Sequence, residues 1–131
     1  LQACFPVTLP DVITVWKATG ISDIKTFVHI SGEGFPQGNL AELPDGPTAQ
    51  EREASRYKAV AEVLNADGET LHMLLDAVNG YSFTALAAAE AGRRVLAGEY
   101  RPGFQTPAAL FGKHFAETIA DTRITTSEAL R

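Results

Sequence analysis

The order of sequence patterns along this chain predicts an α+β fold, in which an antiparallel β-sheet built from hairpins carries two helices packed on one face. Alternating segments rich in β-branched residues come first, at 12–18, 24–30, 55–65 and 70–78. A strong turn signal, Asn-Ala-Asp-Gly, lies between the last two segments. An alanine-rich segment at 81–97 and a second helical segment that begins at Thr106 follow the strands.

The first predicted hairpin joins a strand at 12–18 to a strand at 24–30 through a turn of about five residues. The alternation places Trp16 and Lys17 on opposite faces of the first strand. A lone tryptophan on a strand is more often part of a core or an interface than a substrate contact.

Two other segments of the N-terminal half lack a regular apolar pattern. Residues 1–9 are predicted as an edge strand or an extended lead-in, because Pro6 has no N–H for a ladder bond. Residues 31–48 are rich in glycine and proline and are predicted as a long loop, of a kind that is usually functional or disordered.

The second predicted hairpin joins 55–65 to 70–78. The helix predicted at 81–97 ends naturally at Gly98, with Arg93 and Arg94 suited to the dipole of its last turn.

The last predicted helix begins with Thr106 as its N-cap and Pro107 at its first position. Phe111, Phe115 and Ile119 are spaced four apart, which predicts that they share one helical face. Residues 121–126 are predicted as a final short strand, and residues 127–131 as a frayed terminus.

Composition limits the class of protein. The 131 residues suit a single domain. Their net charge of −5 argues against nucleic-acid or membrane partners, which a basic surface would serve. The single cysteine, Cys4, forms no intramolecular disulfide, so a reducing, cytoplasmic location is expected. No apolar run approaches the roughly 20 residues that span a bilayer.

Few residue patterns indicate chemistry, and no catalytic residue is assigned. The three histidines are far apart in the sequence and no Cys-x-x-Cys spacing exists, so no metal site is predicted. No Gly-x-Ser-x-Gly or Gly-x-Gly-x-x-Gly motif occurs. The helix start at Thr106, with Arg101 nearby, is either an anion site or a plain N-cap.

Several short motifs, in their order, resemble the saccharopine dehydrogenase-like family over roughly residues 7–115. They are Asp11–Ile24 with its Ala-Thr-Gly-Ile turn, Gly46-Pro47-Thr48, Asp67-Gly68, Gly80-Tyr81 with Thr84-Ala85, and Gly103-x-x-Thr106-Pro107-Ala108-x-x-x-Gly112. The resemblance departs from the family at 31–48, where relatives often carry helices. It implies a C-terminal fragment of a larger protein, namely the substrate domain of an NAD(P)-dependent oxidoreductase whose N-terminal Rossmann domain is absent here.

What the resemblance implies for function is a substrate-binding and dimerisation domain that is not active by itself. NAD(P) is expected on the missing Rossmann domain, which would be one partner, and a second copy of the chain would be the other. The residues expected to face substrate are Trp16, Thr19, Gly20 and His29 on the first hairpin, with Arg101 and Thr106 at the helix start. Two alternatives stay open: a non-enzymatic oligomerisation module and a free-standing small-molecule-binding module.

Overall fold

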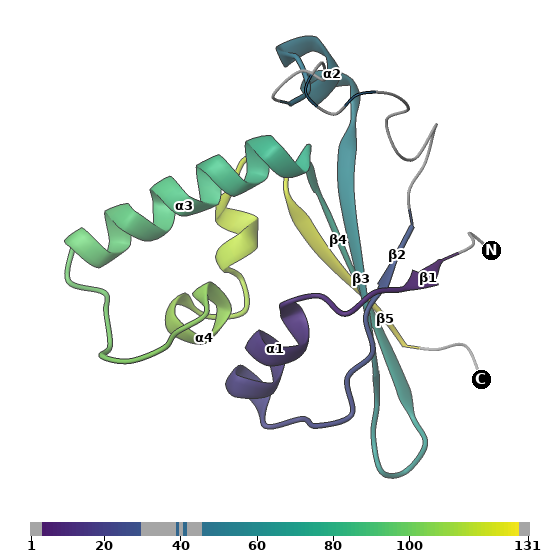
Figure 1. Cartoon of the computed structure of the whole chain (residues 1–131). Helices are drawn as coiled ribbons and strands as arrows, with labels where there is room; N and C mark the ends of the chain where they lie inside the picture. Colours follow the sequence, from purple (N-terminus) through teal and green to yellow (C-terminus); the bar gives the residue numbers. More distant parts are fainter. Residues whose placement is uncertain (1–3, 30–38, 40, 42–45, 129–131) are drawn as a thin grey trace. The chain divides into compact units, whose positions relative to one another are not determined.

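The computed structural model describes residues 4–29, 39, 41 and 46–128. The chain forms two compact units, an N-terminal unit (Leu1–Gly46) and a C-terminal unit (Pro47–Arg131). Helices combine with one two-stranded and one three-stranded antiparallel sheet, so the predicted α+β class is confirmed (Figure 1).

The N-terminal unit is built from a helix between two very short strands. Strand β1 (Phe5–Pro6) pairs antiparallel with β2 (Phe27–Val28), and helix α1 (Asp11–Thr19) lies between them in the chain. The Thr26 hydroxyl donates a hydrogen bond to the Val7 carbonyl, and the Val7 N–H donates to the Thr26 carbonyl over 3.1 Å. None of the described residues of this unit is buried.

The strand predicted at 12–18 is wrong, because these residues form α1. Asp11 lies in the first turn and Lys17 in the last, where each complements the helix dipole. Gly20 ends the helix in the left-handed conformation, with φ of 77°, which glycine adopts without steric cost. These end signals prevail over the β-branched composition, whose cost in a helix is only a few tenths of a kcal/mol per residue, or about 0.7 at most.

The predicted first hairpin is therefore also wrong. Within 24–30 only Phe27–Val28 is a strand, and its partner is β1 rather than a strand at 12–18. The predicted loop at 31–48 lies mostly outside the described residues. Its last residue, Thr48, caps helix α2 (Ala49–Ala54), which the sequence analysis missed. The signal was present as a capping box, in which Thr48 and Glu51 each accept the other's backbone N–H.

The C-terminal unit holds the three-stranded sheet, in the order β3-β4-β5. Strands β3 (Arg56–Leu64) and β4 (Thr70–Val78) form the predicted second hairpin, with Leu64 opposite Thr70 and Arg56 opposite Val78. The final strand is confirmed as β5 (Arg123–Glu128), which pairs with β4. It runs two residues into the segment predicted to fray; residues 129–131 lie outside the described residues.

Register divides the side chains of this sheet into two faces, because directly opposed residues point to the same side. The apolar face consists of Tyr57, Ala59, Ala61, Val63, Leu71, Met73, Leu75, Ala77 and Ile124. The charged face includes Arg56, Lys58, Val60, Glu62, Leu64, His72, Leu74, Asp76 and Arg123.

The helical segments that follow β4 in the chain lie on one side of this sheet (Figure 1). Helix α3 (Gly80–Leu96) confirms the predicted alanine-rich helix and packs on β4, while the 3₁₀ helix η2 (Phe115–Thr118) packs on β5. The Tyr57 ring lies close to the start of α3, since a Cβ built on Gly80 would be 3.6 Å from it. The helices thus cover the apolar face of the sheet. They cover it only at the end of the sheet near Ala77.

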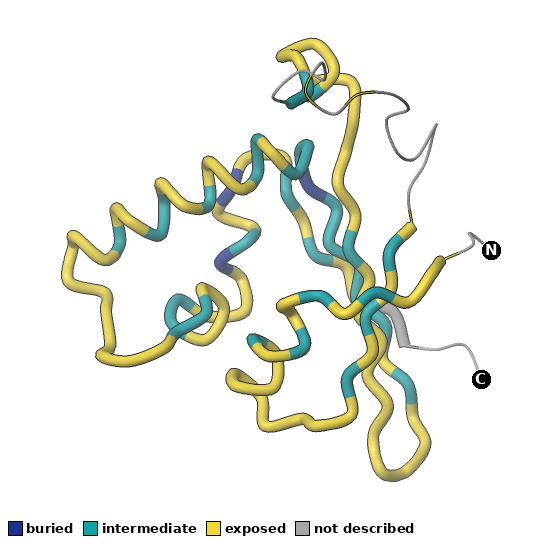
Figure 2. The backbone as a smooth tube through the Cα atoms, in the orientation of Figure 1, coloured by how far each residue is buried: buried dark blue, intermediate teal, exposed yellow. Residues whose placement is uncertain are grey.

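The core of the described structure is small. Ala77 of β4, Phe115 of η2 and Ile119 are the buried hydrophobic residues, each 5% exposed or less (Figure 2). In the part of the chain that is described, no helix is both long and apolar enough to cross a lipid bilayer.

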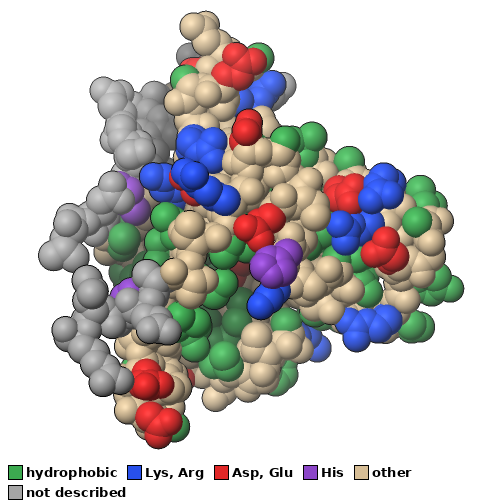
Figure 3. All heavy atoms as spheres, turned by 180° about the vertical axis from the view of Figure 1, so that it is seen from behind, with side chains coloured by type: hydrophobic (Ala, Val, Ile, Leu, Met, Phe, Trp, Pro, Cys, Tyr) green, Lys and Arg blue, Asp and Glu red, His purple; other side chains and the backbone are tan. Residues whose placement is uncertain are grey.

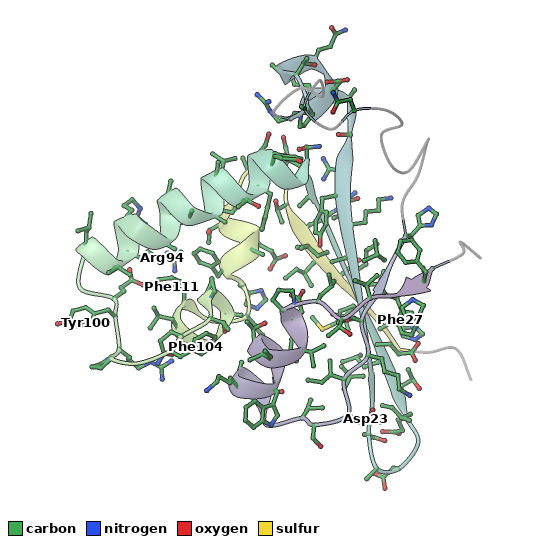
Figure 4. The ribbon with its side chains drawn as sticks, in the orientation of Figure 1. Asp23, Phe27, Arg94, Tyr100, Phe104 and Phe111 are labelled. Carbon is green, nitrogen blue, oxygen red and sulfur yellow. The ribbon has the colours of Figure 1, made fainter. Side chains whose placement is uncertain are left out.

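The last predicted helix is interrupted. Helix α4 (Pro107–Phe111) ends at Gly112, whose φ of 93° breaks the helix between Phe111 and Phe115. The two rings still stack, with centroids 5.1 Å apart. Arg94 reaches from α3 toward Phe111 (Figure 4), and its guanidinium carbon lies 5.4 Å from both ring centroids. Phe111 and Phe115 do lie side by side as predicted. They do so because two separate helices pack together, not because they share one helical face.

Candidate functional site

A hollow of about 590 Å³ opens at the end of the three-stranded sheet where β3 and β5 begin and β4 ends. The residues that line it are Arg56, Asp76, Glu117, Thr118, Ile119, Ala120, Asp121, Thr122 and Arg123. In the view from behind, lysine and arginine side chains gather beside acidic ones on the surface (Figure 3).

Arg56 holds the walls of the hollow together. Its Nε lies 2.5 Å from the Asp76 Oδ1 on the neighbouring strand, and its Nη2 donates to the Asp121 carbonyl over 2.8 Å. One guanidinium thus joins the start of β3, the end of β4 and the turn before β5. Asp121 has a φ of 56°, in the left-handed region that aspartate tolerates better than most residues.

Asp76 is surrounded by cations. Lys58 on β3 and Arg123 on β5 lie directly opposite it in the two strand pairs. The hydrogen bond from Arg56 is the largest influence that lowers the pKa of Asp76, and the charges of Lys58 and Arg123 lower it further. Three cations around one carboxylate leave this part of the charged face with a surplus of positive charge.

Of the two arginines that line the hollow, Arg123 is the one available for a ligand. Its side chain is exposed, and among residues 4–29, 39, 41 and 46–128 it forms no hydrogen bond or ion pair. By contrast, Arg56 is engaged with Asp76 and Asp121. A guanidinium presents parallel N–H donors that match a carboxylate or phosphate in a bidentate manner.

Glu117 forms the opposite wall and is held in its ionised form. The ring Nδ1 of His114 lies 2.6 Å from Glu117 Oε2, and the Ile124 N–H donates to Oε1 over 3.1 Å. These two hydrogen bonds, the one from His114 foremost, lower the pKa of Glu117. Both of its oxygens are therefore occupied by hydrogen bonds within the fold.

A second, smaller hollow of about 300 Å³ lies against α3 and shares Thr118, Ile119 and Ala120 with the first. Glu90 lines it and accepts hydrogen bonds from Arg93 and Arg94. These bonds lower the pKa of Glu90 to about 2. Arg93, the cation that lines this second hollow, is paired with Glu90 within α3, so it is not open to a ligand as Arg123 is.

Three of the residues predicted to face substrate lie at the end of α1, not on a hairpin. Trp16 is 50% exposed, and the Lys17 Nζ lies 5.8 Å from the centroid of its ring, which corrects the expectation that these side chains point apart. The Thr19 hydroxyl donates to the Val15 carbonyl over 2.7 Å, and the Gly20 N–H donates to the Trp16 carbonyl. Thr19 and Gly20 thus close the helix.

The other predicted site residues lie in two different units. His29 follows β2 in the N-terminal unit and is exposed. In the C-terminal unit, Thr106 accepts the Ala109 N–H over 3.2 Å, as an N-cap does, and Arg101 Nη2 donates to the Ala109 carbonyl over 2.5 Å. The structure brings Arg101 and Thr106 together around α4. None of the six lines the hollow, and their substrate contacts stay predictions.

The sequence analysis missed the residues that gather at the hollow. Arg56 and Asp76 belong to no recognisable sequence motif, and the low exposure of the Asp76 side chain, 15%, appears only in the fold. The turn at 65–68 fixes the register of the hairpin, so Lys58 could have been placed opposite Asp76. Arg123 could not have been placed opposite Asp76 from the sequence, because the pairing of β5 with β4 depends on contacts between residues far apart in the chain.

The open side chain of the hollow, Arg123, is a hydrogen-bond donor of the kind that binds anions. Nowhere in the described part of the chain do three histidine, cysteine, aspartate or glutamate side chains converge as a metal site would need. The chain matches no protein-family model, no curated protein and no solved structure.

Proposed function

We propose that this chain is the substrate-binding and dimerisation part of an NAD(P)-dependent oxidoreductase of the saccharopine dehydrogenase-like kind, and that it has no turnover by itself. The observation that carries the proposal is Arg123, an exposed guanidinium that lines the hollow beside the Arg56–Asp76 pair. The ligand class that fits is a small molecule bearing a carboxylate.

The nicotinamide cofactor belongs on a separate domain in this proposal. A dinucleotide site needs parallel strands around a glycine-rich turn. The described strands pair antiparallel throughout, and the sequence has no Gly-x-Gly-x-x-Gly. The residues of this chain therefore do not fit the dinucleotide, and their role is to bind and orient the anionic end of a substrate.

Calorimetric titration of the chain with succinate tests the binding role. Millimolar affinity is expected, as for a small ligand held by one or two charge-assisted contacts. Arg123→Ala should weaken binding roughly tenfold or more, because a hydrogen bond to a charged group contributes about 1.5–3 kcal/mol.

Arg93→Ala is the matched control, because Arg93 is an exposed arginine outside the hollow and should leave succinate binding unchanged. The proposal fails if Arg123→Ala binds succinate as tightly as the unchanged chain. It also fails if NADPH binds this chain without any other domain.

A second candidate function is a non-enzymatic oligomerisation module. The observation that favours it is β3, an edge strand whose residues, with the exception of Ala59, are exposed. Self-association without any carboxylate binding would favour this candidate over the first.

A further inference from the structure

We infer that the outer edge of β3 is a self-complementary dimer interface, which pairs antiparallel with β3 of a second copy around a two-fold axis at Val60. The inference rests on the dimerisation part of the proposed function and identifies the surface responsible. Its partner is a second copy of this chain rather than another protein, because the sequence of β3 complements itself in charge.

No described strand pairs with the outer edge of β3. β3 is the first strand in the order β3-β4-β5, so β4 occupies only one of its sides. Val60 is 72% exposed and Leu64 is 67% exposed, high values for apolar residues at the middle and end of a strand. A nine-residue open edge with such side chains is a template for pairing with another strand.

Backbone bonding shows which residues of the edge would pair. The Asn65 N–H donates to the Glu69 carbonyl over 3.0 Å, at the position that continues the β3–β4 register beyond Leu64 and Thr70. Bonded and non-bonded pairs alternate along an antiparallel ladder. The odd-numbered residues of β3 therefore bond to β4. The N–H and C=O groups of the even-numbered residues point outward, and these are Arg56, Lys58, Val60, Glu62 and Leu64.

A two-fold axis through Val60 pairs all nine residues of β3 with the same strand of a second copy. Lys58 then lies opposite Glu62 of the second copy, and Glu62 lies opposite Lys58 of the second copy. Opposite charges that face each other across strands stabilise a pair. On the apolar face, Tyr57 lies opposite Val63 of the second copy, an aromatic and β-branched pair of the kind that stabilises sheets.

Neighbouring registers lack this complementarity. An axis at Lys58 or at Glu62 would place like charges directly opposite each other. An axis at Ala61 would leave Lys58 facing Leu64 and Glu62 facing Val60. An axis at Ala59 would direct Arg56 at Glu62, but Arg56 is already bound to Asp76 and Asp121.

Glu62 is placed to accept the lysine of a second copy. Its Oε2 lies 2.8 Å from His72 Nε2 on the β4 side, yet its side chain remains 69% exposed. The carboxylate can therefore bind His72 within its own sheet and Lys58 across the axis. The dimer would continue the apolar face over six strands. The backbone groups at the outer edge of β3 in each copy would then be paired.

Charge exchange on the full chain tests the interface, with the dimer dissociation constant measured by sedimentation equilibrium. Lys58→Glu places two pairs of glutamates across the axis and should raise the constant at least tenfold, because two favourable pairs become repulsive. The double variant Lys58→Glu/Glu62→Lys restores opposite charges and should return to within about threefold of the unchanged chain. Lys25→Glu, with the same charge change on the N-terminal unit, should leave the constant unaltered.

Val60→Pro provides a second test that does not depend on charge. It removes an outward N–H while leaving the β3–β4 ladder intact, so the chain should retain its circular dichroism and become monomeric. A dimer that tolerates both Lys58→Glu and Val60→Pro would overturn this interface and leave dimerisation elsewhere. A monomeric unchanged chain that still binds succinate would overturn the interface while leaving the substrate-binding role intact.

Discussion

Glu90 accepts hydrogen bonds from two consecutive arginines on α3, and one of these arginines also lies against two phenylalanine rings. The Arg94 side chain is 18% exposed, so its positive charge is largely removed from water. The negative charge of Glu90 compensates for this loss of hydration. Glu90 thereby supports the contact through which α3 meets Phe111 and Phe115.

The pKa of Glu90 predicts an acid-sensitive contribution to stability. Because its folded pKa of about 2 lies below its usual value of 4.5, this contribution is full above pH 4.5 and is lost as the pH falls toward 2. Glu90→Gln should lower the urea midpoint at neutral pH, and the difference from the unchanged chain should shrink over that window. Urea titrations followed by circular dichroism measure it, with the exposed Glu53→Gln as control; a difference independent of pH would contradict this role.

Residue type alone did not separate the two arginines at the hollow. Arg56 is bound within the fold and Arg123 is open to a ligand, yet both are arginines at the start of a strand. The hairpin register identifies the cross-strand partners of Arg56, whereas the environment of Arg123 depends on a turn at Asp121 and on η2. The half of the candidate site that contains Arg123, which we propose binds an anion, was therefore beyond prediction from the sequence.

Among the elements, those with strong local signals were predicted well and those with competing signals were not. The β3–β4 hairpin has a turn signal that agrees with its alternation, and α3 has both a good composition and a stop at its end. In α1, by contrast, the residues that alternate are apolar on both sides, so the alternation marks no buried face. Pro10, Asp11 and Gly20 marked the ends of a helix there.

Helix α3 depends on its N-cap, Asn79, which also connects the helix to Ser55, the residue directly before β3. Asn79 Oδ1 accepts the Tyr81 N–H over 3.0 Å, and Asn79 Nδ2 donates to Ser55 Oγ over 2.7 Å. Asn79→Ala should destabilise the chain by about 1 kcal/mol, as loss of a cap does, measured by urea unfolding. Asn79→Asp keeps the acceptor oxygen and should lose much less stability. An equal loss of stability would mean that the hydrogen bond to Ser55, rather than the cap, is responsible.

The two compact units of the molecule differ in how much core they hold. Ala77, Phe115 and Ile119 all belong to the C-terminal unit, and no described residue of the N-terminal unit is buried. Chains of about 60 residues are marginally stable, and chains below about 40 residues usually need disulfides, metals or partners to fold. Composition suited one domain of 131 residues, and nothing in it marked the boundary between Gly46 and Pro47.

This difference predicts how the two units behave when separated. Residues 47–131 expressed alone should keep a strand and helix spectrum and unfold cooperatively in urea, whereas residues 1–46 alone should lack a cooperative transition. Circular dichroism with urea titration measures both pieces. An unfolded 47–131 piece would mean that its core depends on the N-terminal residues.

The position of Trp16 has an optical consequence. It is the single tryptophan of the chain and lies on α1, so long-wavelength ultraviolet emission originates entirely from the N-terminal unit. The three tyrosines, at 57, 81 and 100, all lie in the C-terminal unit. An unmodified chain thus carries a separate intrinsic fluorophore in each unit. If the tryptophan and tyrosine signals change at the same urea concentration, the chain unfolds as one cooperative molecule. If they change at different concentrations, the two units unfold independently.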